Sequence, residues 1–184
     1  MDTLKRRTLL FLTTFLCAGC GAHYAGWEQF SRQPSYELPR SVPLVVSRST
    51  LVQTHDDGGF ADTVILVVQQ DLRAEGIEVH VMDARKDNPQ PRVELQFLDW
   101  TEGSQAERYM TAGLVGQAHL RVVCRVIGKD GSALMAGQIT GHESDTTGSA
   151  HNAAEVAAHS IAKALTDAKW VPASAEPAKG TSAQ

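Results

Sequence analysis

The sequence predicts an α/β (α+β) domain, a two-layer sandwich in which a mostly antiparallel sheet of about five strands carries two helices on one face. Two segments repeat apolar residues with helical spacing, and the segments around them alternate apolar and polar residues. Such alternation indicates strands with one wet face, so helices are expected on the other face only. The expected order of elements is β-α-β-β-β-β-α.

The first half of the domain supplies three of these strands and one helix. Residues 42–52 are rich in β-branched side chains and form the expected first strand. Residues 60–75 form the expected helix, and Gly76 is suited to end it. Residues 77–81 and 93–97 alternate strictly, as half-buried strands do. The stripe that would face the sheet repeats every three or four residues: Ala61, Ile65, Val68 and Leu72.

The second half supplies a hairpin and the second helix. Residues 117–127 and 133–140 form the expected strands, joined through the turn pair Asp130-Gly131. Residues 141–149 are rich in glycine and small polar side chains and are expected to be a loop. Residues 150–170 form the expected helix, whose stripe is mostly alanine: Ala154, Ala157, Ala158, Ile161, Leu165 and Ala168.

The N-terminus has the layout of a bacterial lipoprotein export signal. A basic segment (Lys5-Arg6-Arg7) precedes the short apolar run 8–16, which is too brief to span a bilayer as a helix. Small residues then lead to Cys20, the expected lipidation site, although Cys17 stands where leucine is usual. The alternative is ordinary cleavage after Gly19 or Ala22, which would release a soluble periplasmic protein.

This signal sets the expected domain organisation. Residues 1–19 are the signal peptide, 20–41 a lipidated tether, 42–171 the periplasmic domain and 172–184 a disordered tail. Two or more acyl chains on Cys20 would anchor the protein stably to a membrane. Because no aspartate follows Cys20, the expected location is the periplasmic face of the outer membrane.

Charge and cysteine content narrow the classes of partner and chemistry. Without residues 1–19 the chain keeps 14 Lys and Arg against 20 Asp and Glu, which argues against a nucleic-acid partner. Apart from Cys20, the remaining chain has one cysteine, Cys124, so no internal disulfide is expected. Cys124 lies on the apolar side of its predicted strand and is interpreted as a small buried hydrophobic residue.

The candidates for metal or acid–base chemistry are weak. His142 and Glu143 fall in the predicted loop, and His151, Glu155 and His159 follow at spacings of four on the last helix. Histidine and carboxylate are metal-ligand types. However, each step of four turns the position by about 40° around a helix, so three such residues converge poorly on one ion. We therefore expect no metal site, no cofactor and no catalytic residue.

A resemblance to a known family rests on Arg108-Tyr109 and on Gly113-x-x-Gly116, which precede the strand–hairpin–helix segment. These residues resemble a family of Gram-negative lipoproteins of unknown function, in which an Arg-Tyr or Arg-Phe pair precedes a glycine-rich loop. The expected architecture is also similar to the domains of CsgG- and LpoB-like envelope lipoproteins. The resemblance implies a non-catalytic lipoprotein, with Arg108, Tyr109, Gly113 and Gly116 as binding residues.

The sequence thus predicts a lipoprotein whose periplasmic domain is a non-catalytic binding and assembly module for another envelope component. The sheet edges and loop 103–116 are the expected contact surfaces, since loops carry much of binding function. One alternative is a small metal-dependent hydrolase using His142, Glu143 and His151. Another is a carrier for a hydrophobic envelope molecule, which would need an apolar cavity between helices and sheet.

Overall fold

The computed structural model describes residues 23–33, 36–55, 59–85, 88–112, 115–144 and 151–167. The predictions for the signal peptide, for Cys20 and for the tail 172–184 lie outside these ranges. Within these ranges, no helix has the length and apolar character needed to cross a membrane.

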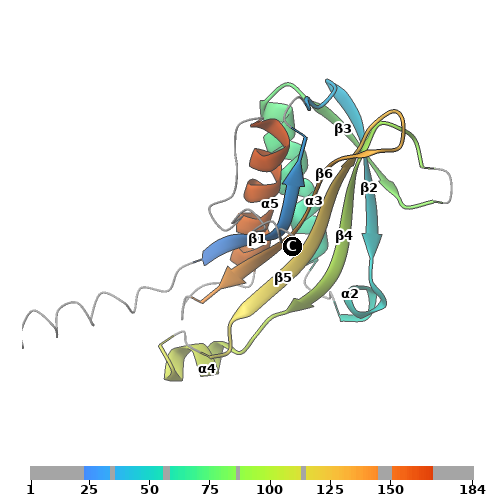
Figure 1. The fold of residues 1–184 in the computed structure, drawn as a ribbon. Coiled ribbons are helices and arrows are strands. Elements are labelled where there is room, and N and C mark those ends of the chain that lie inside the picture. Colours follow the sequence, from blue (N-terminus) through green and yellow to red (C-terminus); the bar gives the residue numbers. More distant parts are fainter. Residues whose placement is uncertain are drawn as a thin grey trace, which may run out of the picture.

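Six strands form one sheet in the order β1-β6-β5-β4-β2-β3 (Figure 1). The pairs β1·β6, β6·β5 and β5·β4 are antiparallel, whereas β2 runs parallel to both β4 and β3. The strands are β1 (His23–Arg32), β2 (Ser41–Arg48), β3 (Glu78–Asp83), β4 (Arg92–Thr101), β5 (Ala118–Ile127) and β6 (Ala133–Glu143).

Two long helices lie side by side against one face of this sheet (Figure 1). They are α3 (Phe60–Ala74) and α5 (His151–Thr166). Two short helices, α2 (Thr50–His55) and α4 (Gln105–Met110), lie at the end of the sheet where β2 and β4 end. The fold is therefore a mixed α+β sandwich, as predicted, with one strand more than expected and two additional short helices.

The additional strand is β1, in a segment expected to be a tether. It escaped prediction because its apolar pattern is broken by a bulge, where the register with β6 shifts between Glu28 and Ser31 and Gln29 takes a φ of 50°. Trp27, which precedes the bulge, is buried on the helix face of the sheet. Its Nε1 donates a hydrogen bond to Ser160 Oγ on α5 at 2.9 Å. Residues 23–32 are thus part of the domain.

The parallel strands were also unexpected, and β2 explains them. The chain leaves β2, passes through α3 and returns as β3, a β-α-β connection that places the two strands parallel. The helix-face residues Val42, Leu44 and Val46 of β2 are buried, and on the open face Val45 is only 3% exposed. The other open-face residues of β2 are half-buried or exposed.

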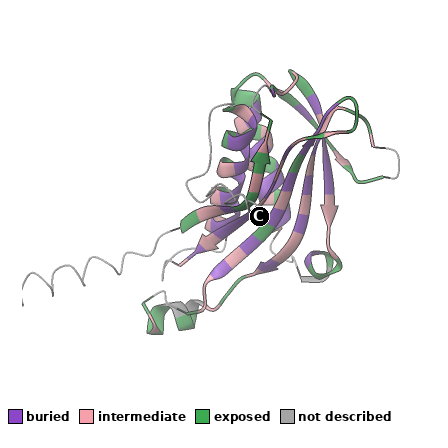
Figure 2. Ribbon diagram, viewed as in Figure 1, coloured by how far each residue is buried: buried purple, intermediate pink, exposed green. Residues whose placement is uncertain are grey.

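The core lies between the sheet and the two helices. Alternate residues of the central strands are buried there, as the purple bands of Figure 2 show. Helix α5 approaches β6 closely because alanines line its stripe and glycines face it. A Cβ atom on Gly141 would overlap the carbonyl oxygen of Ala153, and one on Gly137 would lie 2.8 Å from the Trp27 ring.

The helix stripes follow the sequence prediction where they can be compared. Ala61, Ile65, Val68 and Leu72 of α3 are all buried. The same holds for the described members of the α5 stripe, Ala154, Ala157, Ala158, Ile161 and Leu165. Gly76 ends α3 with a φ of 77°, and Ile77 N donates to Leu72 O at 2.9 Å, the bond that closes such a terminus.

Candidate functional site

The structure separates His142 and Glu143, the first two of the weak metal-ligand candidates. Strand β6 continues to Glu143, so the segment expected to be a loop from residue 141 is still a strand there. Neighbouring residues of a strand point to opposite faces of the sheet. His142 therefore lies half-buried on the open face, whereas Glu143 is fully buried on the helix face.

The members of the set on α5 have other contacts. The His151 ring packs against Phe60 of α3, with 4.5 Å between ring centroids. Glu155 is exposed. His159 Nδ1 lies 2.6 Å from Asp71 Oδ2 on α3. In the described ranges, no three His, Cys, Asp or Glu side chains are grouped to hold a metal ion.

The face of the sheet on which no described helix lies, which we call the open face, carries two histidines at one end. His119 of β5 and His142 of β6 are cross-strand partners, and their ring centroids lie 6.4 Å apart. Tyr24 of β1 stacks on His142, with ring centroids 4.8 Å apart. Burial lowers the pKa of His142, and the neighbouring His119 lowers it further. His142 is therefore neutral at pH 7.

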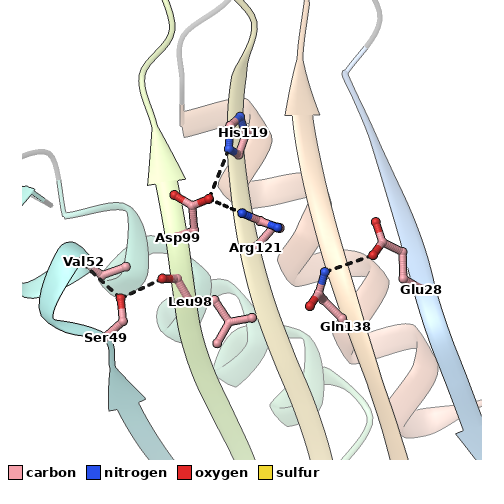
Figure 3. Close-up of polar contacts among 8 residues, drawn as sticks. All are labelled: Glu28, Ser49, Val52, Leu98, Asp99, His119, Arg121 and Gln138. Atoms are coloured by element: carbon pink, nitrogen blue, oxygen red, sulfur yellow. Dashed lines mark hydrogen bonds and ion pairs between the residues drawn. The ribbon is translucent and has the colours of Figure 1, made fainter.

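Next to the histidines, Asp99 of β4 binds two groups on β5 (Figure 3). Arg121 Nη2 donates a hydrogen bond to Asp99 Oδ2, and His119 Nε2 lies 3.6 Å from the same oxygen. The hydrogen bond from Arg121 holds the pKa of Asp99 below its ordinary value. The carboxylate is thus fixed as an acceptor and is poorly suited to donate a proton.

The middle of the open face is covered by further polar pairs. Arg92 Nε lies 2.7 Å from Glu94 Oε1, and the other oxygen of Glu94 faces Arg125 at 4.0 Å. Gln138 Nε2 donates to Glu28 Oε2 at 3.0 Å, which joins β6 to the edge strand (Figure 3). These polar side chains therefore pair with one another on the open face.

At the end of the sheet where β2 ends, one serine fixes the short helix α2 to the sheet. Ser49 Oγ donates to the carbonyl oxygen of Leu98 at 2.7 Å and accepts from Val52 N at 3.3 Å (Figure 3). Both contacts lie where β2 ends, so α2 is held against β4. The exposed side chain of Leu51 is thereby presented at this end of the molecule.

The second candidate surface is the segment from Glu102 to Gln117, which we call the α4 arm. Its base is a close approach of two backbone segments, in which Ser104 N donates to Gly116 O at 2.9 Å. Gly103 and Gly116 have φ values of 64° and 75°, and a Cβ on Gly116 would lie 2.6 Å from Ser104 O. Only glycine fits both requirements, so Gly116 is a structural residue of the arm.

Within the arm, short contacts hold α4 and the turn after it. Ser104 Oγ caps the helix by accepting from Glu107 N at 3.2 Å, and Thr111 Oγ1 accepts from Val115 N at 3.0 Å. At its tip, Tyr109 is 74% exposed and Met110 is 82% exposed. Of the other binding residues expected here, Gly113 and the side chain of Arg108 lie outside the described parts.

Cys124 occupies the position expected for a buried hydrophobic residue. It is a free thiol with no exposed surface, on the helix face of β5. Burial raises the pKa of its thiol to about 12, which keeps it protonated and unreactive at neutral pH.

Two surface pockets lie at the opposite end of the sheet from the α4 arm, and sequence reasoning missed both. Their volumes are about 510 and 380 Å³, and the segment Tyr36–Leu38 forms a wall of each. Tyr36 is 5% exposed, and burial raises the pKa of its hydroxyl above the ordinary value. Neither pocket is lined by the histidines of the hydrolase hypothesis. The burial of Tyr36 beside these pockets could not be predicted, because Tyr36 lies in a proline-containing segment with no periodic pattern of apolar residues.

No protein-family model matches the chain, and no curated protein matches it. Solved structures are similar to the chain. The PelC dodecamer from Paraburkholderia phytofirmans is similar with a TM-score of 0.53 and 17% identity, over 79% of this chain and 98% of that chain. A single-residue variant of the same PelC gives 0.52 and 14% over the same shares. At these identities the likeness shows a shared fold.

Proposed function

We propose that this chain is an outer-membrane-anchored lipoprotein whose periplasmic domain is a non-catalytic binding and assembly module. Its partners are envelope components, the first of which is another copy of the chain. Cys20 carries the lipid anchor, and the open face of the sheet is the main contact surface.

The observation that carries this proposal is the open face itself. In the part of the chain that the structure describes, helices cover one face of the six-stranded sheet, and the other face carries paired polar groups. Such a surface offers shape and a defined charge pattern to a partner, which are the features that set specificity at polar interfaces.

The likeness to PelC supports self-assembly as the form of binding. PelC shares this fold over almost its whole length and is described as a dodecamer. The present chain has two edge strands, β1 and β3, at opposite sides of its sheet. Edges and an uncovered face are the surfaces through which copies of such a domain can associate.

The contacts of the former catalytic candidates also favour a binding role. His142 lies on the open face, Glu143 is buried on the helix face, and His151 packs on Phe60. The first two therefore lie on opposite faces of the sheet. A hydrolytic site would require several of them to converge on one substrate atom.

Photo-crosslinking in cells tests the binding surface. A photoreactive amino acid replaces Val123, half-buried at the centre of the open face, or Leu66, exposed on α3 as the control. We expect the Val123 position to give crosslinks to a second copy or to an envelope protein, and the Leu66 position to give few. Equal or absent crosslinking at both positions would contradict the proposal.

Two measurements complete the test. Mass analysis of the detergent-solubilised full chain should show a homo-oligomer, and a monomer at all concentrations would contradict self-assembly. Mass spectrometry of the mature N-terminus should show an acylated Cys20. An unmodified first residue would overturn the lipid anchor while leaving the binding surface to be judged by the crosslinks.

A further inference from the structure

Among the described residues, five of the seven exposed large hydrophobic side chains lie toward one end of the molecule. Helix α3 and strand β3 contribute one each, Leu66 and Val81. The other five lie on β1, α2 and the α4 arm, and they are Tyr24, Leu51, Tyr109, Met110 and Val115. Single exposed hydrophobic residues are ordinary, but a group of them marks a contact surface.

The registers of the strands show that this is also the end from which the N-terminus emerges. His23, the first residue of β1, pairs with Glu143, which pairs on its other side with Ala118. Ala118 directly follows the α4 arm. With strands about 4.8 Å apart, His23 lies about 10 Å from the base of the arm. Figure 1 shows α4 beyond this end of the sheet, near the start of β1.

The proposed lipid anchor would be very close to this surface. Cys20 precedes His23 by three residues, and three residues of fully extended chain span about 10 Å. Acyl chains on Cys20 would therefore hold the α4 end of the domain against the bilayer. The pockets at Tyr36 and the hairpin at Lys129 would lie at the far end, away from it.

We propose that the tip of the α4 arm docks into the lipid interface, with Tyr109 and Met110 inserted among the headgroups and upper acyl chains. The inference rests on the proposed anchor at Cys20. A tyrosine, with an apolar ring and a polar end, settles well at the membrane interface, and methionine is flexible and apolar. The arm would act as a second membrane contact that orients the domain.

The arm is built to present these side chains. The backbone contact at Gly103 and Gly116 fixes its base, and the caps at Ser104 and Thr111 hold the helix and turn. Little ordering of the backbone is then needed on insertion, which lowers the entropic cost of binding. Figure 2 shows α4 as an exposed segment standing apart from the buried core.

The charges nearby indicate what kind of lipid surface fits. Glu102 at the base of the arm and Glu107 on α4 are exposed, so anionic headgroups near the arm would be repelled. The contact therefore depends on apolar insertion into a mainly zwitterionic surface. Raising the salt concentration should not release it, in contrast to a basic patch on an anionic membrane.

The cysteine content of the chain makes a direct test possible. Cys124 is buried and Cys20 would be blocked by lipid, so a cysteine at Met110→Cys can be labelled alone. The lipidated full chain carries an environment-sensitive fluorophore there and is reconstituted into phosphatidylethanolamine–phosphatidylglycerol vesicles that contain nitroxide lipids. The matched control carries the label at Lys129→Cys in the exposed hairpin at the far end.

We expect strong quenching of the label at position 110 by the nitroxide lipids, and little at position 129. Vesicle-bound protein without quenching at position 110 would overturn the docking and leave the anchor in place. The docking would also be overturned if the fluorophore at position 110 were shielded from water only when copies of the chain associate and were not quenched by the nitroxide lipids. The arm would then contact a second copy. If the chain is not acylated at Cys20, quenching at position 110 after vesicles are added would still support docking, and its absence would refute it.

A second variant shows whether the arm itself carries the contact. A label at Val115→Cys is compared with and without the double substitution Tyr109→Ser and Met110→Ser. We expect the double variant to lower the partition of the arm into lipid by about tenfold, because two apolar side chains are lost. The control substitution Leu66→Ser should leave the quenching unchanged. Equal quenching in all three proteins would mean that the anchor alone places the arm at the surface.

Discussion

The two faces of the central strands carry side chains of opposite kinds, apolar and buried on one face and polar and paired on the other. On β5, Val122 and Cys124 point into the helix layer and are fully buried, whereas Arg121 and Arg125 point to the open face and pair with carboxylates of β4. Burial of apolar surface stabilises a fold much more than exposed ion pairs do. The helix face should therefore hold the domain together, and the open face should tolerate change and be available for binding.

The largest expected difference between the faces comes from neighbouring residues of β4. Phe97 is fully buried, and we expect Phe97→Ala to lower the free energy of unfolding by about 3–5 kcal/mol, because it removes apolar contacts and leaves a cavity. Gln96 points to the open face, and Gln96→Ala should cost less than about 0.5 kcal/mol. Denaturant titration of both variants measures the difference. Similar losses would show that the open face also stabilises the fold.

Added volume should reveal the same asymmetry. Gly141→Ala would bring a Cβ against the carbonyl oxygen of Ala153, so α5 must move, and we expect a loss of about 3 kcal/mol. Gly26 on β1 has open space where a Cβ would be, and Gly26→Ala serves as the control, with an expected change within about 0.5 kcal/mol. Thermal unfolding measures the stability of both variants. Equal stability of Gly141→Ala and Gly26→Ala would contradict the expected difference between the two positions.

The helix layer could be predicted from the sequence because its signals are local and strong. The stripe of α3 and the glycine at its end follow directly from spacing and from the φ that Gly76 adopts. The alternation along β5 gave both of its faces correctly, including the burial of Cys124. These elements have enough residues for their period to be read without knowledge of their neighbours.

The elements that escaped prediction depend on distant partners. Strand β1 is identified by its pairing with β6, because the bulge after Glu28 hides its alternation. The parallel direction of β2 depends on the path through α3. At the site, His142 and Glu143 are separated because β6 extends to pair with β1 and β5, which nothing near residue 141 in the sequence indicates.

A smaller effect should come from the contact that joins β1 to the helix face. Trp27→Phe removes the hydrogen bond to Ser160 and keeps most of the ring, so we expect a loss of about 1 kcal/mol. Ser160→Ala should cost a similar amount, and the double variant should cost little more than either single change. Chemical denaturation gives the coupling energy. Fully additive losses would mean that the two groups do not interact.

The smallest expected effect concerns the open face. The folded-state pKa of Asp99 is lowered, so its ionised form contributes stability at pH values above its ordinary pKa of 3.8, and this contribution is lost as the pH falls through the folded-state pKa. We expect Asp99→Asn to cost less than about 1 kcal/mol at pH 7, and this cost to shrink as the pH falls below 3.8. Measurement of the free energy of unfolding against pH gives the difference between the parent protein and Asp99→Asn. A difference that grows as the pH falls would contradict the lowered pKa of Asp99.

The position of β1 has a mechanical consequence. A lipid tether that begins three residues before His23 would pull along the axis of β1, which is laid antiparallel beside β6. The hydrogen bonds between the two strands run across that axis, so a pull along it loads many of them together in shear instead of opening them one at a time. The hydrogen bond from Trp27 to Ser160 adds a further contact between β1 and α5. The edge strand would thus transmit force from the membrane to the whole sheet without peeling away.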